Sequence, residues 1–356
     1  MPNFFHTWHA ARRACVAALL SLLAVAAITA RADAATGTTA DALRGIVAAG
    51  RLADLKWPDF ADYQGDLRSF YEAGDYALAW SLNGQPTAQA RELIGILQQA
   101  DGKGLDAEDY DASRWAGRLP GLGQPDAAAR FDAALSVGLM RYVSDLHVGR
   151  INPDHFKFKL ATRSSSVDLP QFLRQLAIGG SDLRAQLELV EPPFPGYRRT
   201  QAALRRYLEL AHQDSGAPLP VPAKAVDPGS PYAGVPSLAQ LLRQLGDLPA
   251  DATVPPGDLY QEPLVAAVQR FQERHGLTAD GRLGAQTLRQ LNTPLPVRIE
   301  QLRLTLERWR WLPHEFPQPP VVVNIPEFRL RAFGAGGREM LSMNVIVGSE
   351  SAGVCP

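Results

Sequence analysis

The chain has 356 residues, of which 46% are hydrophobic and 21% are charged, and its formal net charge at pH 7 is −1. This length allows about two or three compact domains, and the 28 prolines and 30 glycines indicate connectors between them. The near-neutral charge argues against a nucleic-acid-binding protein, which usually has a strongly basic face.

Residues 1–34 have the pattern of a secretory signal peptide. Arg12 and Arg13 provide a positive start, an apolar run of about 15 residues follows from Ala14 to Ile28, and Ala32-Asp33-Ala34 fits an A-x-A cleavage site. We therefore expect export to the periplasm. A retained anchor is the alternative, but the apolar run is shorter than the ~20 residues that span a bilayer, so no stable membrane span is expected after cleavage.

Residues 46–213 have a mostly helical pattern. A helix is expected from Ala90 to Ala100, and a longer helix carries an apolar stripe at helical spacing: Phe131, Leu135, Leu139, Tyr142 and Leu146. Such a stripe indicates core packing rather than a binding site.

Short motifs follow one another in this region in a distinctive order. They are Phe70-Tyr71 with Tyr76 and Trp80, Gly104-Leu105-Asp106 with Asp109-Tyr110, and Arg141-Tyr142 before Gly149-Arg150-Ile151-Asn152-Pro153. Their order resembles the scaffold domain that precedes the catalytic domain in large periplasmic L,D-transpeptidases. The resemblance implies a helical scaffold domain over residues 46–213.

A proline-rich connector follows over residues 214–234. Its segment Ala217-Pro218-Leu219-Pro220-Val221-Pro222 is expected to be extended and semi-rigid.

Residues 235–293 contain the pattern of three short amphipathic helices. Ser237 can cap the first, and Gly276 suits the left-handed position that ends the second. Their inward positions are Leu238, Leu241, Leu242 and Leu245 in the first, Leu264, Val268, Phe271 and His275 in the second, and Leu288 and Leu291 in the third.

An ordered set of residues makes this region more specific than a generic helical bundle. The set is Phe271-Gln272, His275-Gly276-Leu277, Ala279-Asp280-Gly281, Gly284, Thr287-Leu288 and Leu291-Asn292. It resembles the peptidoglycan-binding-like three-helix module of bacterial cell-wall enzymes, which implies peptidoglycan, both glycan strands and stem peptides, as the partner. The candidate contacts are Arg270, Gln272 and His275, each of which can equally be a surface or capping residue.

After residue 293 the sequence pattern changes from helix to strand. Residues 294–318 are expected to contain a connecting helix, and residues 319–356 contain three strand patterns, Val321–Pro326, Phe328–Phe333 and Leu341–Val347. The expected fold class is therefore mainly α, with a helical scaffold domain and a three-helix module, followed by the first β-strands of an incomplete all-β catalytic domain.

The resemblance also implies a chemistry whose residues are missing here. L,D-transpeptidases join peptidoglycan stems by 3-3 cross-links through a cysteine thiolate, which the family carries in a Ser-His-Gly-Cys-x-Arg motif. No such motif occurs, and Cys355, the one cysteine outside the signal segment, has no histidine near it. We expect a chain truncated before the catalytic motif, with no catalytic residue. A non-catalytic peptidoglycan-binding or scaffold protein, possible partner of other cell-wall enzymes, is the alternative, and a wall-hydrolase subunit is a third.

The sequence gives no support for a metal or a cofactor. It contains no HExxH, Walker loop or CxxC pattern. His147, Asp154 and His155 include ligand types, but such residues at a helix end and in a loop more often form caps or pairs. We predict no metal and no cofactor.

Overall fold

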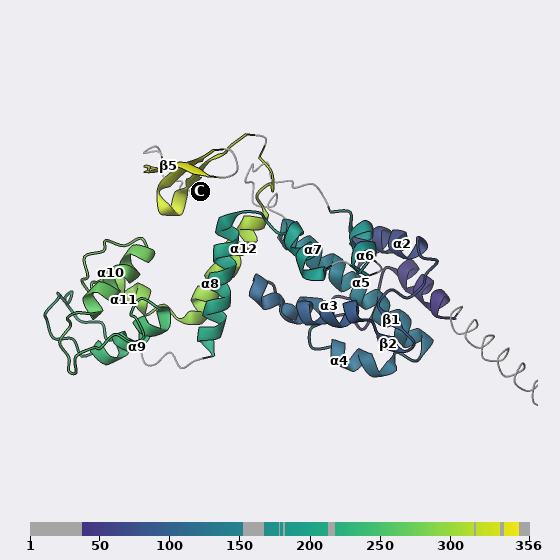
Figure 1. Ribbon diagram of the computed structural model, residues 1–356, viewed down its shortest axis with the longest axis horizontal. Coiled ribbons are helices and arrows are strands. Elements are labelled where there is room, and N and C mark those ends of the chain that lie inside the picture. The colour runs from purple at the N-terminus through teal and green to yellow at the C-terminus, as the bar shows by residue number, and fades with distance from the viewer. Residues whose placement is uncertain are drawn as a thin grey trace, which may run out of the picture. The chain divides into compact units, whose positions relative to one another are not determined.

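The computed structural model describes residues 38–348 except 152–166, 178, 181, 213–217, 317 and 335–337. The described residues fall into two compact units, of which the first ends at Pro192 and the second begins at Pro193. Figure 1 labels many of the elements of both. Within these residues no helix is both long enough and apolar enough to cross a membrane.

The first unit is mainly helical and includes a short antiparallel hairpin, in which β1 pairs with β2. Its elements in chain order are a helix over residues 38–49, η1 (Ala61–Tyr63), α2 (Gln64–Glu72), β1 (Ser81–Leu82), β2 (Gln85–Pro86), α3 (Ala88–Gln98), η2 (Ala100–Lys103), η3 (Ala107–Tyr110), α4 (Trp115–Arg118), η4 (Leu119–Gly121), α5 (Pro125–Val148), α6 (Leu169–Ala177) and α7 (Leu183–Val190).

The long helix α5 forms the centre of this unit. It begins at Pro125, whose missing N–H is no loss in a first turn, and it ends before Gly149. It contacts α3, α6 and α7 (Figure 1). The five residues of the predicted apolar stripe are all buried in the core, which confirms that the stripe serves packing.

A buried carboxylate on α5 joins the helix to the segment before β1. Asp132 is fully buried, and its Oδ1 accepts hydrogen bonds from the Tyr71 hydroxyl at 2.8 Å and the Ala79 N–H at 3.0 Å. Its Oδ2 accepts the Trp80 N–H at 2.8 Å. Ser136, one turn later, accepts the Trp80 indole N–H at 2.9 Å. These bonds hold the chain entering β1 against the middle of α5.

The second unit contains two helical groups. One is a pair of helices, α8 (Pro195–Ala211) and α12 (Leu295–Arg310). They are far apart in the sequence but lie side by side in the fold (Figure 1). Tyr197 and Leu204 of α8 and Ile299 and Leu306 of α12 form the buried centre of this pair. The predicted connecting helix is thus paired with α8, which lies within the range expected for the scaffold domain. The domain boundaries remain predictions.

The other group consists of α9 (Val235–Leu245), α10 (Leu264–Arg274) and α11 (Ala285–Leu291). The three helices share one hydrophobic core, as their apolar spacing predicts. The expected cap at Ser237 is wrong, because α9 begins three positions earlier, with Gly234 as its N-cap and Pro236 in its first turn. Gly276 follows α10 with φ 67°, the left-handed conformation that was predicted.

Three strands follow the helices and form an antiparallel sheet in the order β3-β4-β5. They are β3 (Val321–Asn324), β4 (Arg329–Phe333) and β5 (Glu339–Asn344), with η6 (Ile325–Glu327) between the first two. Every residue of β3 and β5 is exposed. The helices and these late strands confirm the expected fold class, mainly α followed by the first strands of a β region.

Several predictions concern residues that the structure leaves undescribed. The signal segment 1–34, the start of the connector at 214–217, Asp154, His155 and Cys355 all lie outside the described residues.

Candidate functional site

Gln272, one of the three predicted contacts, lies inside the three-helix core. It is only 1% exposed, and its Nε2 donates to Asp280 Oδ1 and the Arg282 carbonyl, both at 3.0 Å, and lies 3.1 Å from Thr287 Oγ1. Its Oε1 accepts the Gly281 N–H at 2.8 Å. Gly281 has φ 72°, so the turn requires glycine there. Gln272 therefore holds this turn in place between α10 and α11, and a direct contact with a polymer would need it to leave these partners.

Arg270, the second predicted contact, is exposed on α10 and donates from Nε to the Asp247 carbonyl at 2.8 Å. Arg274, one turn later, binds the Asp247 carboxylate through Nη2 at 2.6 Å and Nε at 3.2 Å. The two arginines thus fix the segment after α9 onto α10.

His275, the third predicted contact, lies at the end of α10 on the Phe271 ring, with the ring centroids 3.9 Å apart. Its Nδ1 lies 2.8 Å from the Phe271 carbonyl, which can only accept, so Nδ1 carries the proton. Burial lowers the pKa of His275, and the nearby Arg274 and Arg298 lower it further. The bond to the Phe271 carbonyl raises this pKa, but by less than the other effects lower it. The imidazole is therefore neutral at pH 7.

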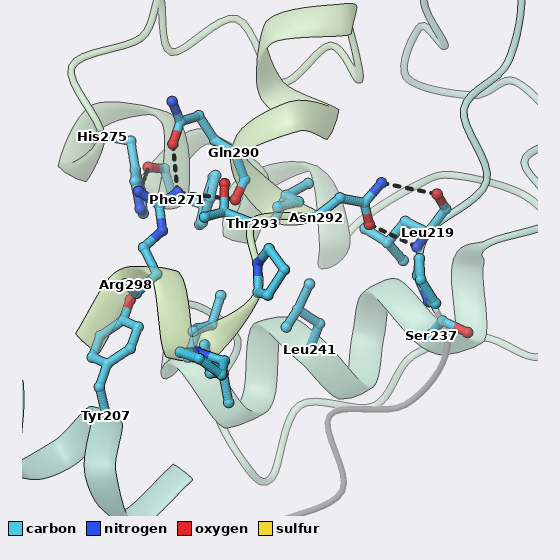
Figure 2. A pocket seen from close by; sticks show the side chains of 16 residues that line it. Tyr207, Leu219, Ser237, Leu241, Phe271, His275, Gln290, Asn292, Thr293 and Arg298 are labelled. Carbon is cyan, nitrogen blue, oxygen red and sulfur yellow. Dashed lines mark hydrogen bonds between the residues drawn. The ribbon is translucent and has the colours of Figure 1, made fainter. Parts of the chain in front are cut away.

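His275 also lines a recess of about 210 Å³ in the second unit (Figure 2). The walls come from α8, the connector, α9, the end of α10 and the segment from Gln290 to Arg298. Side chains that contribute include Tyr207, Leu219, Ser237, Leu241, Leu245, Phe271, His275, Gln290, Leu291, Asn292 and Arg298. The recess is therefore a product of tertiary packing around the three helices.

The cationic end of the recess is formed by Arg298 of α12. Its Nη2 donates to the Gln290 carbonyl at 3.0 Å and also contacts Gln290 Oε1, and its Nη1 donates to Gln301 Oε1 at 3.1 Å. Tyr207 of α8 also lines the recess, beside Arg298 (Figure 2). Among the described residues, Arg298 forms no ion pair with a carboxylate. Burial lowers its pKa from the ordinary value, and Arg274 adds to that effect, yet the guanidinium stays charged.

The opposite end of the recess is held by an amide pair. Asn292 Oδ1 accepts the Leu219 N–H at 2.7 Å, and Asn292 Nδ2 donates to the Leu219 carbonyl at 2.9 Å (Figure 2). This two-bond pairing fixes the connector against the end of α11. Leu241 and Leu245 of α9 add apolar side chains to the lining.

The arrangement fits an anionic group attached to a small apolar body. A half-buried guanidinium whose described partners are neutral oxygens retains its charge for an incoming carboxylate, and such charge-assisted bonds are about twice as strong as neutral ones. The volume is below the ~300–1,000 Å³ of pockets for drug-sized ligands, so it suits a single amino-acid residue rather than a disaccharide.

The structure thus brings one predicted residue, His275, into the recess and leaves Arg270 and Gln272 outside its lining. Peptidoglycan binding by these three residues remains a prediction. Sequence reasoning missed Arg298, because its position depends on how α12 returns to α11. A cation in the first turn of a helix, where the helix dipole disfavours positive charge, was a signal that could have drawn attention to it.

Within the described part of the chain, no group of three or more histidine, cysteine or acidic side chains is placed to hold a metal ion. His147 instead contacts the Val190 carbonyl through Nδ1 at 2.8 Å.

Two families match separate parts of the chain. Residues 65–204 match a family described as a scaffold domain, and residues 232–291 match a putative peptidoglycan binding domain. The second match spans α9, α10 and α11 and most of the recess lining on those helices. No curated protein matches the chain. The order of a scaffold domain and a peptidoglycan-binding domain supports a protein of the bacterial cell wall.

Proposed function

We propose that this protein is a periplasmic cell-wall protein of the L,D-transpeptidase type, and that the described residues attach it to peptidoglycan. The recess takes a carboxylate of a stem peptide, with Arg298 as its counter-ion. The observation that carries this proposal is the half-buried Arg298 guanidinium, which is bound to neutral oxygens at one end of a small recess that is lined in part by the peptidoglycan-binding module.

Three properties of the recess favour a peptide terminus over a sugar. A peptide ends in a carboxylate, which matches the guanidinium in charge and geometry. The apolar wall formed by Leu241, Leu245 and Phe271 suits an alanine-like side chain next to that carboxylate. The neutral His275 adds a polar ring without a charge that would repel a cation elsewhere on the stem.

Replacing Arg298 by glutamine should weaken retention on purified sacculi by about tenfold, because one charge-assisted hydrogen-bond pair is worth about 1.5–3 kcal/mol. The measurement is the fraction of the chain that pellets with sacculi as their concentration is varied. Arg289→Gln is the matched control, because Arg289 is exposed on α11 and does not line the recess. It should change retention less than about twofold.

Two results would count against the proposal. If the wild-type chain fails to pellet with sacculi, the protein does not bind peptidoglycan and the proposed function is wrong. If Arg298→Gln and Arg289→Gln weaken retention equally, the attraction is a general effect of positive charge, and the recess has no special part in it.

A second candidate function is acyl transfer, which the scaffold match and its place before the peptidoglycan-binding module favour. That reaction needs a thiolate with a base beside it, because a thiol is mostly protonated at neutral pH. These 356 residues carry no Ser-His-Gly-Cys-x-Arg motif to supply them. We therefore assign attachment to this sequence, and 3-3 cross-linking of stem peptides by the purified chain would reverse that choice.

A further inference from the structure

An exposed tryptophan stands on the first unit, remote in sequence from the peptidoglycan-binding module. Trp57 lies in the loop between the helix over residues 38–49 and η1, and 52% of its surface is exposed. An indole is the largest apolar side chain, so leaving half of it in water forgoes a substantial burial energy. A single exposed apolar residue needs no explanation by itself, but this one is held in place.

Three contacts fix the orientation of Trp57. Its indole N–H donates to Asp109 Oδ1 at 3.1 Å, and its backbone carbonyl accepts a bond from Arg141 Nη2 at 2.8 Å. The Lys56 ammonium lies 5.5 Å from the centre of its ring. The exposed indole is therefore a preorganised surface, which would lose little conformational entropy when a ligand stacks on it.

Charged side chains surround this ring. Asp109, which is almost fully buried, accepts the Lys56 ammonium at 2.8 Å and lies 2.7 Å from Arg150 Nη2. Asp106 lies 3.6 Å from the same ammonium and is more than half exposed. The Lys56 and Asp109 bond raises the pKa of Lys56, and the pKa of Asp109 is lowered because Lys56, Trp57 and Arg150 outweigh its burial. Lys56 and Asp109 therefore both stay charged near neutral pH.

This setting distinguishes a sugar from a protein partner. The centre of a protein interface is depleted of charged residues, whereas Lys56, Asp106 and Arg150 stand immediately around Trp57. A pyranose ring has a face of C–H groups and a rim of hydroxyls. The face can stack on the indole, while the hydroxyls reach ammonium and guanidinium donors and a carboxylate acceptor at the rim.

We propose that Trp57 is the stacking platform of a carbohydrate-binding site on the first unit, with Lys56, Arg150 and Asp106 at its rim, and that it takes a pyranose of a glycan strand. The choice of the wall glycan as the natural ligand rests on the proposed function. The site itself does not, because it lies on a different unit from the recess and involves none of its residues.

The test uses the full chain and a soluble β-1,4-linked N-acetylglucosamine tetramer as the probe, titrated by isothermal calorimetry. Trp57→Ala should weaken binding by about tenfold or more, and Trp57→Tyr, which keeps a stacking face, should recover most of it. Leu189→Ala is the control, because Leu189 is 74% exposed on the same unit and lies on α7. It should leave binding unchanged.

Binding of the tetramer and binding of a peptide carboxylate separate this proposal from the previous one. Arg298→Gln should leave tetramer binding intact, and Trp57→Ala should leave intact any binding of a peptide carboxylate. If the wild-type chain does not bind the tetramer, or if Trp57→Ala binds it as tightly as the wild type, the carbohydrate site is overturned. Equal loss with Trp57→Ala and Trp57→Tyr, with the fold retained, would also overturn stacking as its basis.

Discussion

Replacing Asp132 by alanine should lower the free energy of unfolding of the first unit by about 3–5 kcal/mol near pH 4. The substitution leaves the N–H groups of Ala79 and Trp80 without their acceptor in the core, and it leaves the Tyr71 hydroxyl with Ser136 Oγ, 2.8 Å away, in place of two partners. Each buried donor left in this way costs about 1–3 kcal/mol. Since Asp132 joins α5 to the segment before β1, we expect the loss to appear across both.

The size of this loss should depend on pH. Burial raises the pKa of Asp132 from its ordinary value of 3.8 to about 6, against the hydrogen bonds from Ala79, Trp80 and Tyr71. The pKa of Asp132 is higher in the folded chain than in the unfolded chain, so protonation of Asp132 stabilises the fold. This contribution is fully present below pH ~4 and is lost as the pH rises through about 6. The shift corresponds to about 3 kcal/mol, so the destabilisation by Asp132→Ala should be smaller by up to that amount at pH 7.

Hydrogen exchange of peptides from α2 and α5 measures this effect in the unit that contains Asp132. The wild type and the variant are compared at the same pH, between pH 4 and pH 7, so that the intrinsic exchange rate cancels. Glu188→Ala is the control, because Glu188 is an acidic residue of the same unit that is exposed on α7. If wild type and Asp132→Ala differ by a constant amount at every pH, then Asp132 does not titrate in this window.

The helices of this protein were predictable because apolar spacing reports packing directly. The stripe from Phe131 to Leu146 is buried, and the predicted inward leucines, valine and phenylalanine of α10 and α11 lie in the shared core, whereas His275 follows α10 and lies outside that core. The start of α9 was misplaced because Ser237 is a good cap in isolation, while Pro236 suits a helical first turn equally well. Competing local signals of this kind are settled only by the surrounding structure.

The polar residues were predicted less well, because a polar residue is expected at the surface unless partners are known. Asp132 accepts hydrogen bonds from residues that lie more than fifty positions earlier in the sequence. The recess likewise depends on α12 returning to α11, so Arg298 has no neighbour in sequence that indicates its role. A tryptophan in a sequence is normally expected in the core. Only the exposure of Trp57 in the fold and its bond to Asp109, 52 residues later, distinguish it from a core residue.

Replacing Gln272 by glutamate should destabilise the three-helix group by about 2–4 kcal/mol. The Gln272 amide donates to Asp280 and to the Arg282 carbonyl from a position that is 1% exposed. A carboxylate has no proton to donate. Its negative charge would face the negative charge of Asp280, and its oxygen lone pairs would face those of the Arg282 carbonyl. Either the glutamate takes up a proton or the turn separates from α10, and both cost stability.

The position of Gln272 decides how its loss would affect wall binding. If Gln272 acts only by holding the turn, Gln272→Glu should lose retention on sacculi in proportion to the fraction unfolded, and should regain it at temperatures where the three helices remain folded. Circular dichroism during heating measures the folded fraction in the same samples. Gln269→Glu, a half-buried position three residues earlier on α10, makes the same change without those partners and should cost far less. Lost retention in a fully folded Gln272→Glu chain would instead make Gln272 a contact residue, which its burial argues against.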